Sequence, residues 1–210
     1  MTKSAKDLLE GAYALNTAED NVAYYKDFAA VYDDGFAEDL GYQSPQLIAA
    51  YLAEVLTNPS EIADIGCGTG LIAPFLQGHQ IDGFDISKEM IAVARAKDIY
   101  REFYEVDLTA DLDGLPTRYD ALISAGTFTH GHLGADILIH LLDLLRPKAW
   151  VAITVSVGHF EATDFQKVLT NAQKANRISQ AEFREFKIFS KPNDAHSNDL
   201  GYLIRFQKMS

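Results

Sequence analysis

EIADIGCGTG, residues 61–70, sets a short apolar run directly before a turn that is rich in glycine. The run at 62–65 predicts a buried strand, and we expect a helix over about 69–77. Glycine lets the backbone approach a ligand closely, and the first N–H groups of a helix have no partner inside the helix. Three glycines at alternate positions are more than a tight turn needs. The stretch therefore predicts a ligand-binding loop between a strand and a helix.

Downstream of this loop, short apolar runs alternate with helical patterns. Strands are expected at 62–65, 81–86, 102–106, 121–124 and 150–157, and helices at 88–97, capped by Ser87, and at 135–145. This alternation is typical of a parallel sheet with helices on both faces. Two further runs, 183–190 and 200–208, are joined without helical periodicity, which favours an antiparallel hairpin. We expect an α/β fold with a doubly wound, mainly parallel, seven-stranded (Rossmann-like) sheet that ends in this hairpin.

The first part of the chain has a different character. Residues 1–58 are rich in Ala, Tyr and acids and predict helices. Ser44 stands where an N-cap is expected, with Pro45 at the first helical position, and the helical pattern ends at Asn58 and Pro59. We therefore expect one domain, 1–210, in which a helical cap at 1–58 covers an α/β core at 59–210.

Composition limits what the chain binds. Its 210 residues are 48% hydrophobic, and the formal net charge is -12. A negative field repels nucleic acid and anionic membranes, so we expect neither as a partner. Cys67 is the single cysteine, which excludes an internal disulfide and a multi-cysteine zinc site, and we expect no metal. Residues 1–20 contain no long apolar run, so we expect neither a signal peptide nor a membrane span there and predict a cytoplasmic protein. We also expect its substrate to be a small molecule.

The residues around the glycines narrow the choice of ligand. A phosphate-binding P-loop needs Lys and then Ser or Thr after its last glycine, but Leu71 and Ile72 follow here. The dinucleotide fingerprint G-x-G-x-x-G would require glycine at position 71. This spacing disfavours a nicotinamide or flavin dinucleotide as the ligand but does not exclude one, so a dinucleotide is kept as the alternative. Asp85 ends the second expected strand and suits the two ribose hydroxyls of an adenosine, while Asp107 ends the third and suits an adenine amino group.

These motifs together resemble a known family. DIGCGTG at 64–70, Asp85, Asp107 and YDALIS at 119–124 resemble the successive motifs of class I S-adenosylmethionine-dependent methyltransferases, over about residues 20–157. YKDFAAVYD at 25–33 is similar to the Y-D-x-x-A-x-x-Y-D helix of many small members, with Lys26 in place of Asp. With GYQSP at 41–45 and GTFTHGH at 126–132, the chain also resembles the Williams–Beuren-region methyltransferase-like proteins. It departs from the family at Lys148 and Ala149, where Gly-Gly is usual.

The resemblance implies S-adenosylmethionine as the cofactor and an in-line displacement at its sulfonium methyl group. Tyr32 would reach the methionine carboxylate, and the glycine loop would pass under the methionine part. The implied cofactor-binding residues are Tyr25, Tyr32, Asp64, Gly66, Cys67, Gly68, Asp85, Ile86, Met90, Asp107, Leu108, Ser124 and Ala125.

Catalytic groups are harder to assign. His130 and His132 follow the fourth expected strand on the reaction side, so either is a candidate general base. The alternative is that both only cap a helix or hold a loop. We therefore expect a methyltransferase acting on a small molecule, with the acceptor atom open. The competing functions are an NAD-dependent oxidoreductase and a binding protein that keeps the cofactor without transferring methyl groups.

Overall fold

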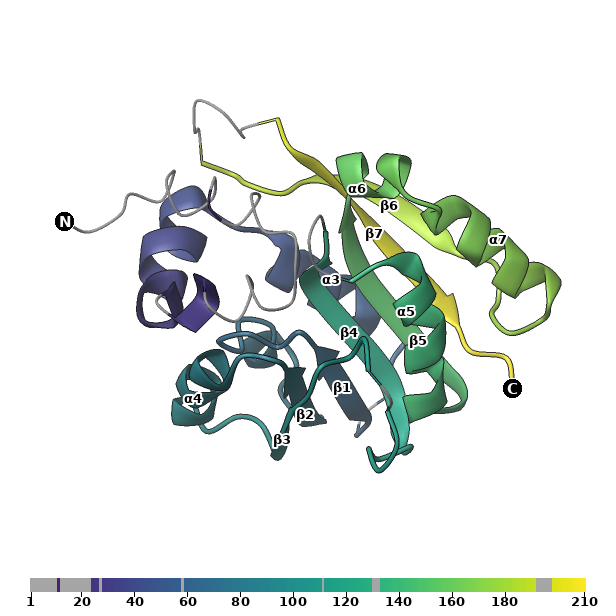
Figure 1. Ribbon diagram of the computed structural model, residues 1–210, viewed down its shortest axis with the longest axis horizontal. Helices are drawn as coiled ribbons and strands as arrows, with labels where there is room; N and C mark the ends of the chain where they lie inside the picture. The colour runs from purple at the N-terminus through teal and green to yellow at the C-terminus, as the bar shows by residue number, and fades with distance from the viewer. Residues whose placement is uncertain are drawn as a thin grey trace.

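The computed structural model of the protein describes residues 11, 24–26, 28–57, 59–110, 112–129, 133–191 and 198–210. Within them, seven strands form one sheet in the order β3-β2-β1-β4-β5-β7-β6 (Figure 1). The strands are β1 Glu61–Ile65, β2 Gln80–Asp85, β3 Glu102–Glu105, β4 Tyr119–Phe128, β5 Leu145–Ser156, β6 Glu182–Lys187 and β7 Leu200–Gln207. The strands from β1 to β5 pair in parallel, whereas β7 runs antiparallel to both β5 and β6. The predicted doubly wound sheet with a terminal hairpin is confirmed.

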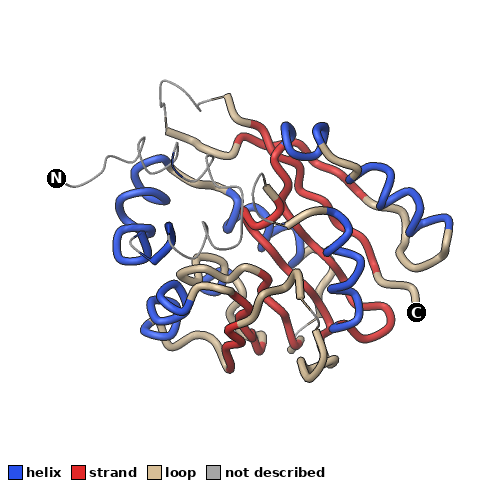
Figure 2. Tube along the Cα trace, in the orientation of Figure 1, coloured by secondary structure: helices blue, strands red, loops and turns tan. Residues whose placement is uncertain are grey.

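Helices cover both faces of the sheet (Figures 1 and 2). They are α3 Ser44–Ala53, α4 Lys88–Ala96, α5 Ala135–Leu141, α6 Val157–Ala162 and α7 Phe165–Lys174. Successive strand residues point to opposite faces. In β1, Ala63 therefore joins the apolar core under α5 and α7, while Ile62 joins the core under α3. The predicted Ser87 cap is confirmed, because its Oγ accepts the Met90 N–H at 3.3 Å.

The helix expected over 69–77 does not form. Only a 3-10 turn, η3 Ala73–Phe75, follows the loop. Gly66, Gly68 and Gly70 all have positive φ, and Pro74 has no N–H to donate, so the chain enters no α-helix here. The expected cap of α3 is also displaced by one residue. Gln43 is the N-cap, Ser44 is already helical, and α3 ends at Ala53, well before Asn58.

Two parts of the structure lie outside the sequence expectations. The helices α6 and α7 follow β5 and were not predicted. Strand β4 continues to Phe128, with a change of register against β5 between Ser124 and Phe128. This irregular end of β4 leads into one of the loops that surround the site.

The cap, by which we mean residues 24–26 and 28–43, packs its rings together beside the sheet (Figure 1). It contains the 3-10 turn η1 Ala29–Val31 and the π-helix η2 Asp33–Glu38. Its last residues pair with the chain that leaves β6: the Gln43 N–H donates to the Ile188 carbonyl at 2.9 Å, and the Ser190 N–H donates to Gly41 at 2.9 Å. The cap is therefore anchored to the antiparallel half of the sheet.

At the amino ends of the parallel strands, which we call the amino edge, arginines surround the carboxylates. Asp82, fully buried, accepts hydrogen bonds from Arg101 at 2.9 and 2.8 Å, from Arg118 at 3.0 Å and from the Tyr119 hydroxyl at 2.8 Å. Burial works to raise the pKa of Asp82, but these bonds outweigh it, and the pKa lies below its usual value. Every oxygen of this buried acid therefore has a partner.

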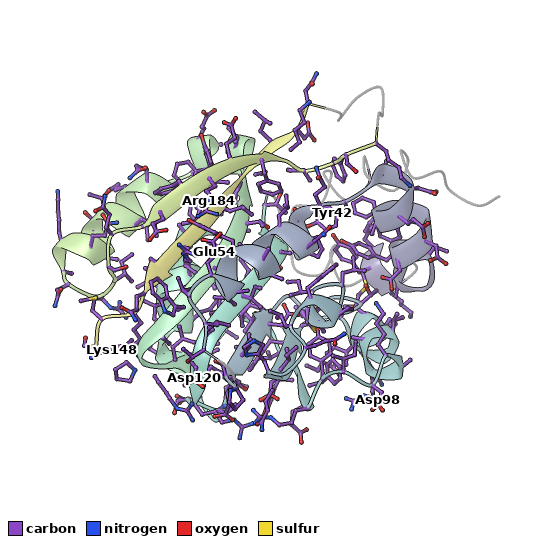
Figure 3. The ribbon with its side chains drawn as sticks, turned by 180° about the vertical axis from the view of Figure 1, so that it is seen from behind. Tyr42, Glu54, Asp98, Asp120, Lys148 and Arg184 are labelled. Atoms are coloured by element: carbon purple, nitrogen blue, oxygen red, sulfur yellow. The ribbon has the colours of Figure 1, made fainter. Side chains whose placement is uncertain are left out.

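The same pattern extends across the edge. Arg146 bridges Asp120 at 2.7 Å and Glu61 at 2.6 Å. Figure 3 shows Asp120 and Lys148 at this edge. Tyr42, in the cap, lies toward the opposite ends of the strands. A network of arginines and carboxylates thus spans the amino edge.

Candidate active site

A cavity of about 530 Å³ lies at the opposite, carboxyl edge of the sheet, between the ends of the parallel strands and the cap. A cavity of this size is in the range of small-molecule sites. Its walls are Tyr25, Tyr32, Gly66, Gly68, Asp85, Ile86, Ser87, Met90, Val106, Asp107, Leu108, Thr109, Ala125, Gly126, Thr127, Leu133, Gly134 and His159. Of the thirteen predicted cofactor residues, all but Asp64, Cys67 and Ser124 are among them. The sequence motifs therefore converge on one cavity.

The glycine loop forms the floor of the cavity. The N–H groups of Gly66 and Cys67 both donate to the Phe84 carbonyl, at 2.8 and 3.0 Å, which pins the loop to β2. Gly66 has φ +65°, and a Cβ there would collide with the Thr127 side chain. Gly68 has φ +52°, and a Cβ there would meet nothing within 4 Å. Glycine at 66 makes the close packing possible, and at 68 it leaves open space above the loop.

Asp85 stands at the end of β2, where the loop meets the start of α4. Its Oδ2 accepts the Gly68 N–H at 2.7 Å, and its Oδ1 accepts the Ser87 N–H at 2.8 Å. Burial raises the pKa of Asp85, and these backbone bonds only partly oppose it. Each carboxylate oxygen can accept a further hydrogen bond. Asp85 is therefore oriented by the backbone and still has capacity for two hydroxyl groups.

The predicted residues Asp64, Cys67 and Ser124 lie behind the cavity wall. The Ser124 hydroxyl donates to the Ile65 carbonyl at 2.7 Å, and Cys67 is buried against Gly83. Asp64 is fully buried, and its Oδ2 accepts the Tyr100 hydroxyl at 2.6 Å. These side chains support the floor of the cavity and do not form its surface.

Asp64, unlike Asp82, is held by a hydroxyl group and not by arginines. Burial raises its pKa to about 7, the Tyr100 hydrogen bond opposes this, and the charge of nearby Asp85 adds to it. The other oxygen, Oδ1, is buried and has no hydrogen-bond partner among the described residues. A cation bound in the cavity would favour the charged form of both acids.

The far end of the cavity is lined by apolar side chains and by one acid, Asp107. Met90 and Leu108 are buried there, and Val106 lies beside them. Asp107 accepts hydrogen bonds from the N–H and the hydroxyl of Thr109, at 2.9 and 2.7 Å. The arrangement suits a flat ring with a polar edge.

The candidate bases stand as follows. His130 and His132 lie outside the described residues, so both remain predictions. His159, which the sequence analysis did not assign to the site, lies on the cavity wall. The backbone N–H of His159 donates to the Ser156 Oγ at 3.4 Å, and its ring packs edge-on to Phe165 with ring centroids 5.7 Å apart. The signal for His159 was its position three residues past Ser156, the end of the fifth strand.

The cap is joined to the glycine loop through Asp33. One carboxylate oxygen accepts the Thr69 hydroxyl at 2.5 Å, and the other pairs with Lys97 at 2.5 Å. Tyr32, a wall residue, directly precedes Asp33. These contacts hold the aromatic wall of the cavity in place.

A profile of the family described as "Methyltransferase domain" matches residues 62–148, which include the loop, Asp85 and Asp107. This part of the chain therefore matches a methyltransferase domain, as the resemblance of its motifs predicted. It is similar to methyltransferase-like protein 27 of Homo sapiens, with 27% identity over 156 residues that cover 70% of this chain and 62% of that protein. It is also similar to trans-aconitate 2-methyltransferase of Mycobacterium tuberculosis, with 27% identity over 146 residues, 65% of this chain and 53% of that enzyme.

Among solved structures, magnesium protoporphyrin IX methyltransferase from Synechocystis with bound S-adenosylmethionine aligns with a TM-score of 0.64. The two are 21% identical, and the alignment covers 99% of this chain and 98% of that one. This similarity confirms the fold. The chain spans 62% and 53% of the lengths of the two curated relatives.

Two further findings concern the described residues alone. Among them, no group of three or more His, Cys, Asp and Glu could hold a metal ion. Nor does that part of the chain contain a helix long and apolar enough to cross a membrane.

Proposed function

We propose that the protein transfers the methyl group of S-adenosylmethionine to a small-molecule acceptor. The observation that carries the proposal is Asp85, held by the Gly68 and Ser87 N–H groups at the wall of the cavity. The proposal treats 1–210 as a single methyltransferase domain, with 1–58 as cap and cofactor lid and 59–210 as core.

The walls of the cavity fit the parts of this cofactor. Asp85 would accept hydrogen bonds from the ribose hydroxyls. Asp107, Leu108 and Met90 would frame the adenine, and the loop at Gly66–Gly68 with Tyr32 would hold the methionine part. Burial raises the pKa values of Asp64 and Asp85, and a positively charged ligand in the cavity would favour the charged forms of both carboxylates.

The cofactor supplies an electrophilic methyl group on a sulfonium, so the protein contributes positioning and the exclusion of water. The cap provides that cover through Tyr25 and Tyr32. A base is needed only where the acceptor must lose a proton. His130, His132 and His159 are the proposed candidates, since imidazole titrates near neutral pH.

A small acceptor is favoured by the position of the cavity between the strand ends and the cap, and by the net charge of -12, which opposes nucleic acid and anionic membranes as partners. The proposal includes a cytoplasmic location, which rests on the sequence alone. A protein or peptide acceptor, an NAD-dependent reaction and binding without transfer are the outcomes that would count against it.

The first experiment compares stabilisation of the protein by S-adenosylhomocysteine, NAD and FAD in a thermal melt. We expect a concentration-dependent rise in Tm with S-adenosylhomocysteine alone. A rise with NAD alone would overturn the proposal.

The second experiment supplies S-adenosylmethionine with a labelled methyl group, together with a cell extract separated into small-molecule and protein fractions. We expect label in the small-molecule fraction. Label only in the protein fraction would refute the small acceptor. Absence of transfer to any fraction, with tight binding of S-adenosylhomocysteine, would refute transfer.

A further inference from the structure

A second pocket of about 80 Å³ adjoins the cofactor cavity. The two share Tyr25, Tyr32 and Gly126 as walls, so they meet where the cap faces the end of β4. The remaining walls come from the cap, from the ends of β4 and β5, and from the chain around β6 and β7. The small pocket therefore lies on the methionine side of the proposed cofactor position, away from Asp107.

Aromatic rings dominate the walls of the small pocket. Phe36, Tyr42 and Phe189 form a triangle with ring centroids 5.8 to 6.0 Å apart. Tyr32 stacks on Phe36 at 5.0 Å, which continues the ring surface up to the shared wall. Such distances are those of favourable edge-on and offset ring contacts, so a further ring would find the same geometry here.

The polar groups of this pocket are hydroxyls. Ser44, Thr129, Thr154 and Ser156 line it, and Thr154 already accepts the Gly126 N–H at 2.9 Å. Among the described wall residues there is no Asp, Glu, Lys, Arg or His. A charged group placed among rings and hydroxyls would lose its hydration without gaining an ionic partner.

We propose that this small pocket binds the methyl acceptor and selects an uncharged aromatic group. The inference rests on the proposed function and adds the substrate class. The ring of the acceptor would lie against the side of this ring cluster that lines the pocket, and its nucleophilic atom would face the cofactor cavity past Tyr32 and Gly126. At about 80 Å³ the pocket is smaller than the roughly 150 Å³ cavity that holds benzene in an apolar core, so only part of the ring enters it and the rest extends into the larger cavity.

The test measures ligand binding to the protein saturated with S-adenosylhomocysteine. The probes are phenol, benzoate and benzylammonium, which have one ring each and differ in charge. We expect phenol to bind at least tenfold more tightly than benzoate and benzylammonium in an NMR titration. Equal or tighter binding of either charged probe would overturn the proposal.

A variant locates the site. Thr129→Trp fills the small pocket, and we expect it to weaken phenol binding at least tenfold while S-adenosylhomocysteine still binds by calorimetry. The matched control is Thr117→Trp, at an exposed threonine outside both pockets, which should change neither affinity. Unchanged phenol binding in Thr129→Trp would refute the assignment.

The outcome separates this inference from the proposed function. If S-adenosylhomocysteine binds the unaltered protein and phenol does not, the acceptor class is wrong while the cofactor assignment stands. If S-adenosylhomocysteine itself does not bind, the proposed function fails at its first step.

Discussion

The two edges of the sheet use their carboxylates in opposite ways. At the amino edge, Asp82 is bound by Arg101 and Arg118. At the carboxyl edge, Asp85 is held by backbone N–H groups, and Asp64 is held by the Tyr100 hydroxyl. The pKa of Asp82 is lowered, whereas those of Asp64 and Asp85 are raised by burial. Arginines thus neutralise the buried acid at one edge, whereas backbone N–H groups and a hydroxyl hold the two buried acids at the other.

The comparison predicts that changes at the amino edge affect stability and changes at the carboxyl edge affect binding. Removing one partner of a buried ionic cluster leaves the others uncompensated. Removing an acid from a ligand site costs mainly the bonds made to the ligand. Substitutions on the two edges can test this division.

Asp82→Ala has the largest expected effect. It leaves the buried Tyr119 hydroxyl and the Arg101 fork without their acceptor, so the free energy of unfolding should fall by about 3–5 kcal/mol in urea denaturation. The control is Asp164→Ala, whose exposed carboxylate pairs with Lys167 at 3.6 Å and should cost less than about 0.5 kcal/mol. A loss below 1 kcal/mol in Asp82→Ala would mean that the network adds little.

Asp85→Ala should have the complementary effect. We expect affinity for S-adenosylhomocysteine to fall at least tenfold, about 1.4 kcal/mol, because a charged acceptor of hydrogen bonds is lost. The unfolding free energy of the ligand-free protein should change by less than that of Asp82→Ala. Calorimetry measures the first quantity, and unchanged affinity would remove Asp85 from the ribose position.

The pH dependence of stability should report Asp64. Its pKa is raised to about 7 in the folded protein, so between about pH 4 and 7 the native state holds a proton that the unfolded chain has lost. Stability therefore falls as pH rises through this window, by up to about 1.4 kcal/mol per pH unit from this group, and the loss is complete above pH 7.

The comparison for this effect is Asp64→Asn, whose amide oxygen can still accept the Tyr100 hydroxyl. Urea denaturation of the ligand-free proteins at pH 5, 6, 7 and 8 should show the pH slope of the unaltered chain reduced in the variant. Parallel curves would show that Asp64 does not titrate in this window.

Lys148→Gly has the smallest expected effect. Lys148 has φ +66°, a left-handed conformation that favours glycine, at the position where the family usually has Gly-Gly. We expect a gain of up to about 1 kcal/mol in unfolding free energy, with unchanged affinity for S-adenosylhomocysteine. Lys148→Ala retains a Cβ and should bring no gain, so an equal gain in both variants would exclude backbone strain as the cause.

The order of the parallel strands could be predicted because the buried parts of β1, β2, β4 and β5 are apolar runs separated by glycine, acids and helical patterns. The helix expected after the loop was wrong, since three glycines with positive φ and Pro74 keep the chain out of the α conformation. Motif positions also predicted which residues gather at the cavity. They did not predict that Asp64 and Ser124 point behind its wall, because side-chain direction depends on the register of strands within the sheet.

Contacts between distant parts of the chain were beyond the sequence patterns. Asp33 reaches Thr69 and Lys97, and no periodicity within the cap indicates either partner. His159 enters the cavity because α6 begins directly after β5, a helix that the sequence analysis did not predict. In both cases tertiary packing decides the position of a polar side chain that local patterns leave open.

The backbone pairing of the cap with residues 188–191 has a consequence for biosynthesis. Gly41 and Gln43 are translated about 145 residues before their partners Ser190 and Ile188. The cap must wait through the synthesis of about 145 residues before these bonds can form, and such distant pairing is slow to close. The residues of the glycine loop are thus translated long before the residues that anchor the cap.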